Sequence, residues 1–189
     1  PADEYWAILV NEYGLIGIDA ALMGDDAGPN GGKEVAIREV AGGCICCSAG
    51  FMFRVSLVLL LQRRPHRLII EPTGLAALSG IMETLYQPGI KESVDVRSII
   101  CLMDPSKFSD DYLRSEVQDQ IETADILLAG RSDLTSEAKK EEFRRWATQL
   151  FPPKRHVGEV RHGQIPMPLL DLVTERQAKP YKQAHSHGT

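Results

Sequence analysis

Three of the four cysteines of the chain crowd into four residues, at Cys44, Cys46 and Cys47, directly after a pair of glycines. Thiolates are soft ligands that suit Zn²⁺, Co²⁺ or Cu⁺, and the glycines let the backbone fold so that two or three sulfurs converge. A closed structural zinc site takes four protein ligands, and the fourth cysteine, Cys101, lies within a predicted strand. We therefore interpret the cluster as an incomplete or exchangeable metal site, with buried or redox-active thiols as the alternative.

Carboxylates and glycines follow several strand-like runs. Glu71 stands three residues before Gly74, as in nucleotide hydrolases whose acid holds Mg²⁺ while the glycine N–H points at the terminal phosphate. Glu12 and Asp19 flank two glycines, which suits a loop over a phosphate-bound metal ion. Asp133 follows a later run, and its carboxylate is able to accept two N–H bonds from guanine. Each residue alone is more typical of a strand-terminal acid or a helix cap, so the hypothesis depends on their combination.

The elements that must position these residues alternate in type along the chain. Short aliphatic or β-branched runs, several of them apolar on both faces, alternate with longer segments of helical period. The predicted strands span residues 6–10, 35–40, 67–71, 97–103, 125–129 and 155–160. This order predicts an α/β fold, with a mostly parallel sheet and helices on both of its faces. Ligands bind beyond the carboxyl ends of the strands in such folds, which is where the candidate residues stand.

Two helices are predicted from the pattern of apolar residues. One lies within residues 136–150, with Thr135 as its cap and with Lys and Arg on its outer face. The Phe-Pro-Pro sequence at 151–153 ends it. The other covers the apolar run 51–61, which Arg54 interrupts and which is too short to span a bilayer. We expect this second helix to be buried.

Composition limits the classes of protein to consider. The 189 residues are 43% hydrophobic and 25% charged, which is typical of a globular domain with a real core and excludes disordered, collagenous and disulfide-rich chains. With 21 Lys and Arg against 26 Asp and Glu, the formal net charge is −5. We therefore expect neither nucleic acid nor a membrane as a partner. The acidic first residues are unlike a secretory signal, so we expect a cytoplasmic protein.

Taken together and in this order, these pieces resemble the CobW family of P-loop GTPases, the cobalamin-synthesis and zinc-metallochaperone proteins. The matching segments are NEYG at 11–14 with GID at 17–19, GCICC at 43–47, EPTGLA at 71–76, Asp104 at a strand end, and ADILL at 124–128 leading to SDL at 132–134. The resemblance covers about residues 6–172, and its CxCC piece is the most specific. It implies a G domain of the P-loop NTPase type at residues 1–173, followed by a polar, His-containing linker at 174–189 toward a C-terminal domain.

The resemblance also implies an activity. A protein of this family binds GTP with Mg²⁺, carries Zn²⁺ or a similar ion such as Co²⁺ on its CxCC motif, and uses hydrolysis to deliver the ion to a client metalloprotein. Glu71 and Gly74 would supply the catalytic acid and the backbone amide of the second switch. Glu12 and Asp19 would belong to the first switch region.

The remaining roles concern the base and the cargo. Asp133 would read guanine, with Arg131 stacking on the base and His162 near it in the loop after the last strand. The clustered cysteines, Cys44, Cys46 and Cys47, would hold the cargo metal beside the nucleotide. The chain departs from the family here, because Gly130 and Arg131 stand where Asn and Lys are usual.

The phosphate-binding loop of the family is expected before Trp6, and five residues precede this position. The segment at 28–34 imitates such a loop, but Glu34 stands where a Ser or Thr binds Mg²⁺. We attribute the gap to a lost N-terminal segment and expect the chain as written to bind GTP weakly or not at all. A missing strand leaves an unpaired sheet edge, so we expect such a fragment to self-associate into a homo-oligomer.

Two classes of function stay open at this point. The first is a GTP-hydrolysing metallochaperone, which predicts Mg²⁺-dependent GTP binding once the phosphate-binding segment is present. The alternative is a non-hydrolysing metal-binding or interaction module on a degenerate G domain, which predicts zinc binding that ignores nucleotide. A thiol redox protein is a third and weaker interpretation, since adjacent cysteines form strained disulfides.

Overall fold

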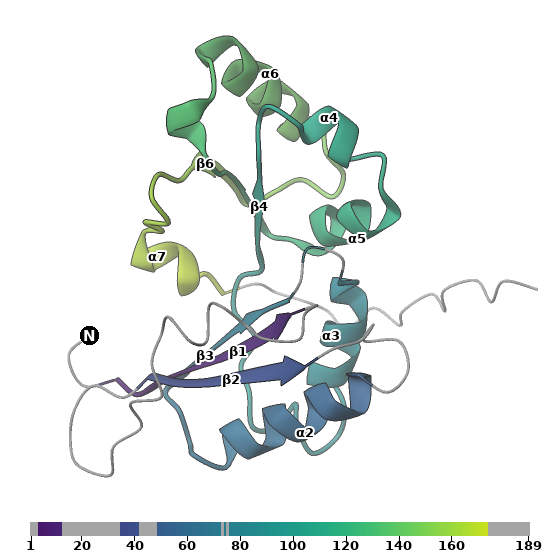
Figure 1. Ribbon diagram of the computed structural model, residues 1–189, viewed down its shortest axis with the longest axis vertical. Coiled ribbons are helices and arrows are strands. Elements are labelled where there is room, and N and C mark those ends of the chain that lie inside the picture. Colours follow the sequence, from purple (N-terminus) through teal and green to yellow (C-terminus); the bar gives the residue numbers. More distant parts are fainter. Residues whose placement is uncertain (1–3, 13–34, 42–48, 73, 75, 174–189) are drawn as a thin grey trace, which may run out of the picture. The chain divides into compact units, whose positions relative to one another are not determined.

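The computed structural model describes residues 4–12, 35–41, 49–72, 74 and 76–173. The chain divides into two compact units, Pro1–Ser93 and Val94–Thr189. Each unit contains a three-stranded sheet in which every registered strand pair is parallel, with helices packed against it (Figure 1). All six strands predicted from the sequence are present, shifted at their ends by no more than three residues.

The first unit is built around the sheet β2-β1-β3. Its elements are β1 (Trp6–Glu12), β2 (Val35–Ala41), α2 (Ala49–Leu61), β3 (Arg67–Glu71) and α3 (Leu78–Leu85). The central strand β1 sets Ala7 and Leu9 into the interior with no exposed surface, as expected for a strand paired on both sides. The register pairs Val10 of β1 with Glu71 of β3, so the carboxyl ends of the strands lie at one edge of the sheet.

The start of this sheet is held together by polar contacts between β1 and β3. Glu4 accepts a hydrogen bond from Arg67 Nε at 2.6 Å and another from Trp6 Nε1 at 3.1 Å. The Arg67 guanidinium also lies 5.3 Å from the centroid of the Trp6 ring. The hydrogen bond from Arg67 is the largest cause of a lowered pKa at Glu4. These contacts fix the amino ends of the strands, opposite the edge where the candidate residues stand.

Helix α2 corrects the expectation of a buried helix. It runs along the sheet, in contact with β2 and β1, and buries Phe53, Leu57 and Leu60 (Figure 1). Its other side leaves Phe51 68% and Met52 48% exposed. A helix lying on a sheet turns one side toward it, so a helix that is apolar all round buries only part of its apolar surface unless something covers the rest.

The second unit is built around the sheet β4-β5-β6. Its elements are β4 (Ile100–Met103), α4 (Phe108–Asp111), α5 (Ser115–Thr123), β5 (Ile126–Ala129), the 3₁₀ turn η1 (Ser132–Leu134), α6 (Glu137–Ala147), β6 (His156–Glu159) and α7 (Met167–Leu170). One face carries a core that includes Leu127, Phe108 and Phe143, and the other packs Ile126 and Leu128 against Leu169 of α7. Helices therefore cover both faces of this sheet, as the sequence predicts.

Helix α6 confirms the predicted element and corrects two of its details. Its N-cap is Ser136, whose Oγ accepts from the Lys139 backbone N–H at 3.4 Å, whereas Thr135 Oγ1 donates to the Arg131 carbonyl at 3.1 Å. Lys140 does not lie on an outer face, because its side chain is only 4% exposed. A carboxylate from β6 faces this helix, and it makes burial of the ammonium group tolerable.

Candidate functional site

The carboxyl edge of the first sheet carries the residues predicted to contact phosphate and metal. Glu71 ends β3 with its side chain exposed, and Gly74 follows it, with no atom within 4 Å of the position where a Cβ would stand. Glu12 ends β1, and the register places its backbone opposite Ala41 at the end of β2. The structure thus brings Glu71, Gly74 and the backbone of Glu12 to one edge of the sheet.

The other predicted residues of this half lie outside the described residues, namely Asp19, Cys44, Cys46 and Cys47. In the sequence, Cys44 follows Ala41, the last residue of β2, by three positions.

Cys101 is not part of any such cluster. It lies within β4 at 8% exposure, and burial raises the pKa of its thiol to about 11. A thiol with that pKa stays protonated near neutral pH and is a poor metal ligand. Across the part of the chain that the structure describes, no group of three His, Cys, Asp or Glu side chains is arranged to hold a metal ion.

The second unit brings the predicted base-reading residues to the carboxyl ends of β4 and β5. Met103 ends β4 opposite Ala129, and the Gly130 N–H donates to the Met103 carbonyl at 2.8 Å. Arg131 follows in the left-handed conformation, with φ of 52°, which is uncommon for a residue with a side chain. Such conformations persist where surrounding contacts impose them, and they gather at ligand sites.

Asp104 is a partner of Arg131 that the sequence analysis did not identify as a site residue. Its Oδ2 lies 3.4 Å from Arg131 Nη1 across the two strand ends. Its Oδ1 accepts from the Ser106 hydroxyl at 2.6 Å and from the Ser106 N–H at 2.9 Å. The Ser106 hydroxyl is the largest cause of the lowered pKa of this carboxyl, which Arg131 lowers further. The only sign in the sequence that Asp104 contacts Arg131 is its position as an acidic residue at the end of a strand.

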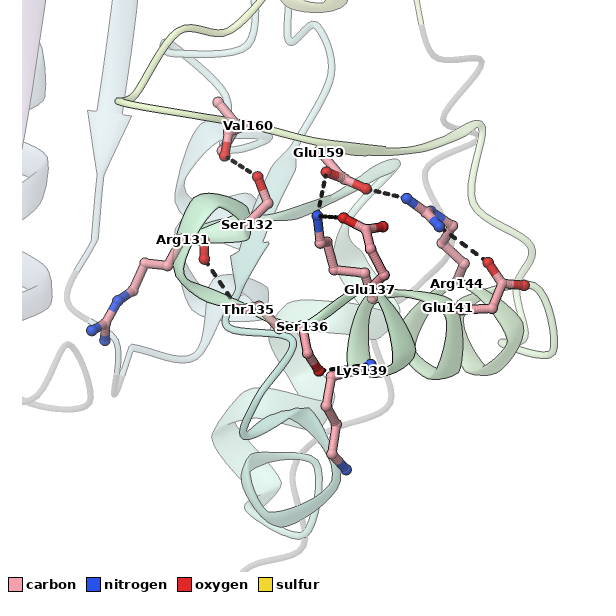
Figure 2. Close-up of polar contacts among 11 residues, drawn as sticks. Arg131, Ser132, Thr135, Ser136, Glu137, Lys139, Glu141, Arg144, Glu159 and Val160 are labelled. Carbon is pink, nitrogen blue, oxygen red and sulfur yellow. Dashed lines mark hydrogen bonds and ion pairs between the residues drawn. The ribbon is translucent and has the colours of Figure 1, made fainter.

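The turn that carries Asp133 is fixed on both sides. Ser132 is 1% exposed, and its Oγ donates to the Val160 carbonyl at 3.2 Å, which ties η1 to the end of β6 (Figure 2). Thr135 and the Leu134 N–H both bond the Arg131 carbonyl. Asp133 itself stays exposed on this rigid turn. His162 is likewise exposed, two residues beyond Val160, with φ of 50°.

An ionic network on α6 holds the end of β6 in place. Glu159 pairs with Arg144, and its Oε2 lies 3.8 Å from the buried Lys140 Nζ (Figure 2). Lys140 also pairs with Glu137, and Arg144 Nη1 donates to Glu141 at 3.0 Å. The end of β6, next to the Val160 carbonyl that accepts from Ser132, is therefore anchored to α6 by the cations of Lys140 and Arg144. Sequence spacing gives the pairs within α6 but not the partner from β6, which is 15 residues beyond Arg144.

Comparison with known proteins identifies the family. The family model for the CobW/HypB/UreG nucleotide-binding domain matches residues 1–157. "Zinc chaperone YeiR" of Escherichia coli strain K12 is 36% identical over 189 residues, covering 98% of this chain and 55% of its own length. "Zinc chaperone CobW" of Sinorhizobium sp is 26% identical, covering 86% of this chain and 53% of its own. The chain thus spans about half the length of these curated relatives.

Among solved structures, the chain resembles the Zn(II)-bound YjiA GTPase from E. coli, with a TM-score of 0.53, 18% identity, and coverage of 89% of this chain and 61% of that one. This likeness confirms the predicted α/β fold of the P-loop GTPase type. The chain belongs to the CobW/HypB/UreG family of nucleotide-binding domains, as the motifs predict. Among the described residues, no helix combines the length and apolarity needed to cross a membrane.

The ionic network leads to a prediction about stability. Glu159→Gln removes the partner of Arg144 and leaves the buried Lys140 with Glu137 alone, so we expect a loss of about 1–3 kcal/mol in the free energy of unfolding. Urea unfolding followed by circular dichroism measures it. The matched control is Glu142→Gln, which breaks the pair with Lys139 in which both side chains are 46% exposed and shifts stability by less than about 0.5 kcal/mol. Equal losses in both variants would contradict a buried anchor.

Proposed function

We propose that the protein is a GTP-dependent zinc chaperone, whose G domain binds and hydrolyses GTP and carries Zn²⁺ on Cys44, Cys46 and Cys47 for a client metalloprotein in the cytoplasm. The observation that carries this proposal is the family match over residues 1–157. In the sequence, that span holds the cysteine cluster after β2 and before β3, and Glu71 ends β3. The relatives named as zinc chaperones support zinc as the cargo.

Phosphate and Mg²⁺ binding are assigned to the carboxyl edge of the first sheet. In the first unit, the exposed carboxylate of Glu71 suits Mg²⁺, a hard cation that takes oxygen ligands directly or through water. Mg²⁺ would neutralise charge on the phosphates during transfer. The Gly74 N–H is assigned to the terminal phosphate, and Glu12 and Asp19 to the first switch. Open space beside Gly74 supports its role, because a phosphate needs close approach to the backbone.

Base recognition is assigned to the turn after β5. Asp133 is exposed on a turn whose neighbours are bonded in place, so its carboxylate is positioned to accept two N–H bonds from guanine with little loss of conformational freedom. Gly130 supplies no side-chain amide, and Arg131 offers a planar guanidinium that stacks on aromatic faces. Asp104 orients that guanidinium from the neighbouring strand end. His162 approaches from the next loop.

Zinc is cargo here, and the number of thiols fits that role. Three sulfurs from one short segment leave a coordination position of a tetrahedral ion for an acceptor to enter, whereas four protein ligands would close the site. Co²⁺ suits similar ligands, so affinity alone does not set the metal. A metal site with an open coordination position suits transfer of the ion to an acceptor better than long-term storage of it.

The metal assignment is tested with serine variants of the full-length protein. We expect Cys44→Ser with Cys46→Ser to lower Zn²⁺ affinity at least about 100-fold, because the remaining thiol cannot hold the ion alone. Competition with a chromophoric chelator measures this affinity. The matched control is Cys101→Ala, which leaves Zn²⁺ affinity unchanged because this buried thiol is protonated. Loss of zinc in the Cys101 variant, or retention in the double variant, would overturn the assignment.

The base assignment predicts a change of nucleotide. Asp133→Asn replaces an acceptor with a donor and an acceptor, so we expect GTP affinity to fall about 10- to 100-fold and xanthosine triphosphate, which offers a carbonyl at the same place, to gain. Fluorescent-nucleotide titration measures both affinities. Asp110→Asn, at an exposed acid of α4, is the matched control and should change neither. Wild-type protein that binds zinc but shows no GTP binding would favour the non-hydrolysing metal module instead.

A further inference from the structure

The outer face of α2 is an unusual feature that nucleotide and metal binding leave unexplained. Phe51, Met52, Val58 and Leu59 are 68%, 48%, 37% and 36% exposed on the side of the helix away from Phe53, Leu57 and Leu60. Their spacing, i, i+1, i+7 and i+8, places them on one helical side. Single exposed apolar residues are ordinary, whereas a grouped set on one helix marks an interaction surface.

Arginines border this outer face in the sequence. Between Glu39 and Glu71 the chain, whose net charge is −5, holds four arginines and no acidic residue, and one of the four, Arg67, pairs with Glu4. Arg54 is exposed on α2 itself, and Arg63 and Arg64 are exposed directly after its last turn. A second copy docked through the same face would bring further arginines, and no acidic side chain of this segment, to pair with them. A partner whose apolar surface is bordered by acidic side chains would bring carboxylates to these arginines.

The place of α2 in the chain connects it with the metal. In the sequence, Ala49, the first residue of α2, follows Cys47 by two positions, and Phe51 begins the outer face two residues later. An acceptor takes a metal ion only when its own ligands reach the ion at bonding distance, about 2.0–2.3 Å for zinc. Any protein that draws the metal from this cluster must therefore come within reach of the first turns of α2.

We propose that the outer face of α2 is the docking surface for the metal-accepting protein, which contacts Phe51, Met52, Val58 and Leu59 through an apolar surface bordered by Asp or Glu. The proposal rests on the proposed function, because it assumes that the cysteines carry the metal. Docking buries the apolar side chains, and the arginines select the partner and speed encounter. Docking also aligns the acceptor with the open coordination position, so a transfer between two proteins becomes effectively intramolecular.

Two synthetic peptides test the surface directly. Both are helical, with a leucine stripe and a Cys-x-x-Cys zinc site at one end, and the stripe is bordered by Glu in one and by Lys in the other. Zinc-loaded full-length protein is mixed with each at physiological salt, and stopped-flow fluorescence of a dye attached beside the Cys-x-x-Cys site of the peptide follows the arrival of zinc. We expect the acidic peptide to receive zinc at least about tenfold faster, although the net charge of −5 would by itself favour the basic one.

Variants then assign the effect to α2. Phe51→Ser with Val58→Ser should slow transfer to the acidic peptide about tenfold, and Arg54→Glu with Arg63→Glu should reverse the preference between the peptides. The matched controls lie in the second unit: Phe151→Ser, at an aromatic side chain that is 87% exposed, and Arg145→Glu, at an exposed arginine, should change neither. Zinc release to a small chromophoric chelator should be the same in every variant, because a chelator needs no docking surface.

The contrary outcomes are distinct. Absence of a preference between the peptides, or equal effects in the control variants, overturns the docking surface while leaving the zinc site intact. If the protein dimerises and Phe51→Ser abolishes the dimer, the face belongs to a second copy. If the protein binds phosphatidylglycerol vesicles and the same change abolishes binding, the face belongs to lipid. Either result overturns the proposal. Failure of the wild-type protein to hold zinc on its cysteines removes the proposed function itself, which the chelator measurement shows independently.

Discussion

Parallel pairing of the strands is the constraint on which the candidate sites depend. Because every registered pair in both sheets is parallel, the backbone hydrogen bonds that hold the strands also carry all their carboxyl ends to one edge of each sheet. Residues far apart in sequence, such as Glu12 and Glu71, or Asp104 and Arg131, become neighbours at these edges for that reason alone. Contacts at the opposite ends, above all Glu4 with Arg67, keep the strands in this register without occupying the functional edge.

The turn after β5, at the carboxyl edge of the second sheet, is held in place by contacts from neighbouring elements. Asp133 stands two residues after Arg131, which adopts the left-handed conformation, a strained geometry that isolated chains rarely adopt. The Ser132 hydroxyl donates to the Val160 carbonyl just beyond β6, and Gly130 and Arg131 bond Met103 and Asp104 at the end of β4. The network of Lys140, Arg144 and Glu159 then fixes the strand that receives Ser132. A turn held in this way spends little free energy on ordering itself when a ligand binds, which is why the base assignment is proposed for it.

The sequence predicted the strands well because each is a short run rich in aliphatic residues, and it predicted the family from motifs whose spacing survives in the chain. It did not predict what depends on contacts between distant segments. Lys140 has the spacing of a surface residue, and its burial depends on two carboxylates, that of Glu137 in the same helix and that of Glu159 in another element. Thr135 and Ser136 are equivalent caps by pattern, and the bond from Thr135 to Arg131 decides between them. Apart from Arg54, the exposed side of α2 is as apolar as the side packed on the sheet, so its pattern does not separate the two sides. The roles of the cysteines, Glu71, Asp133 and His162 stay predictions, as does the division into a G domain at 1–173 and a linker.

The central claim is that one domain holds both GTP and zinc and couples them. Linkage makes the coupling measurable, since a nucleotide that changes zinc affinity by some factor must have its own affinity changed by zinc to the same extent. The most direct measurement is the zinc affinity of the full-length protein, by chelator competition, with and without GTP and Mg²⁺. The account predicts that GTP tightens zinc binding by about 5- to 150-fold, with the reciprocal effect of zinc on GTP. A zinc affinity that GTP and Mg²⁺ leave unchanged would contradict it.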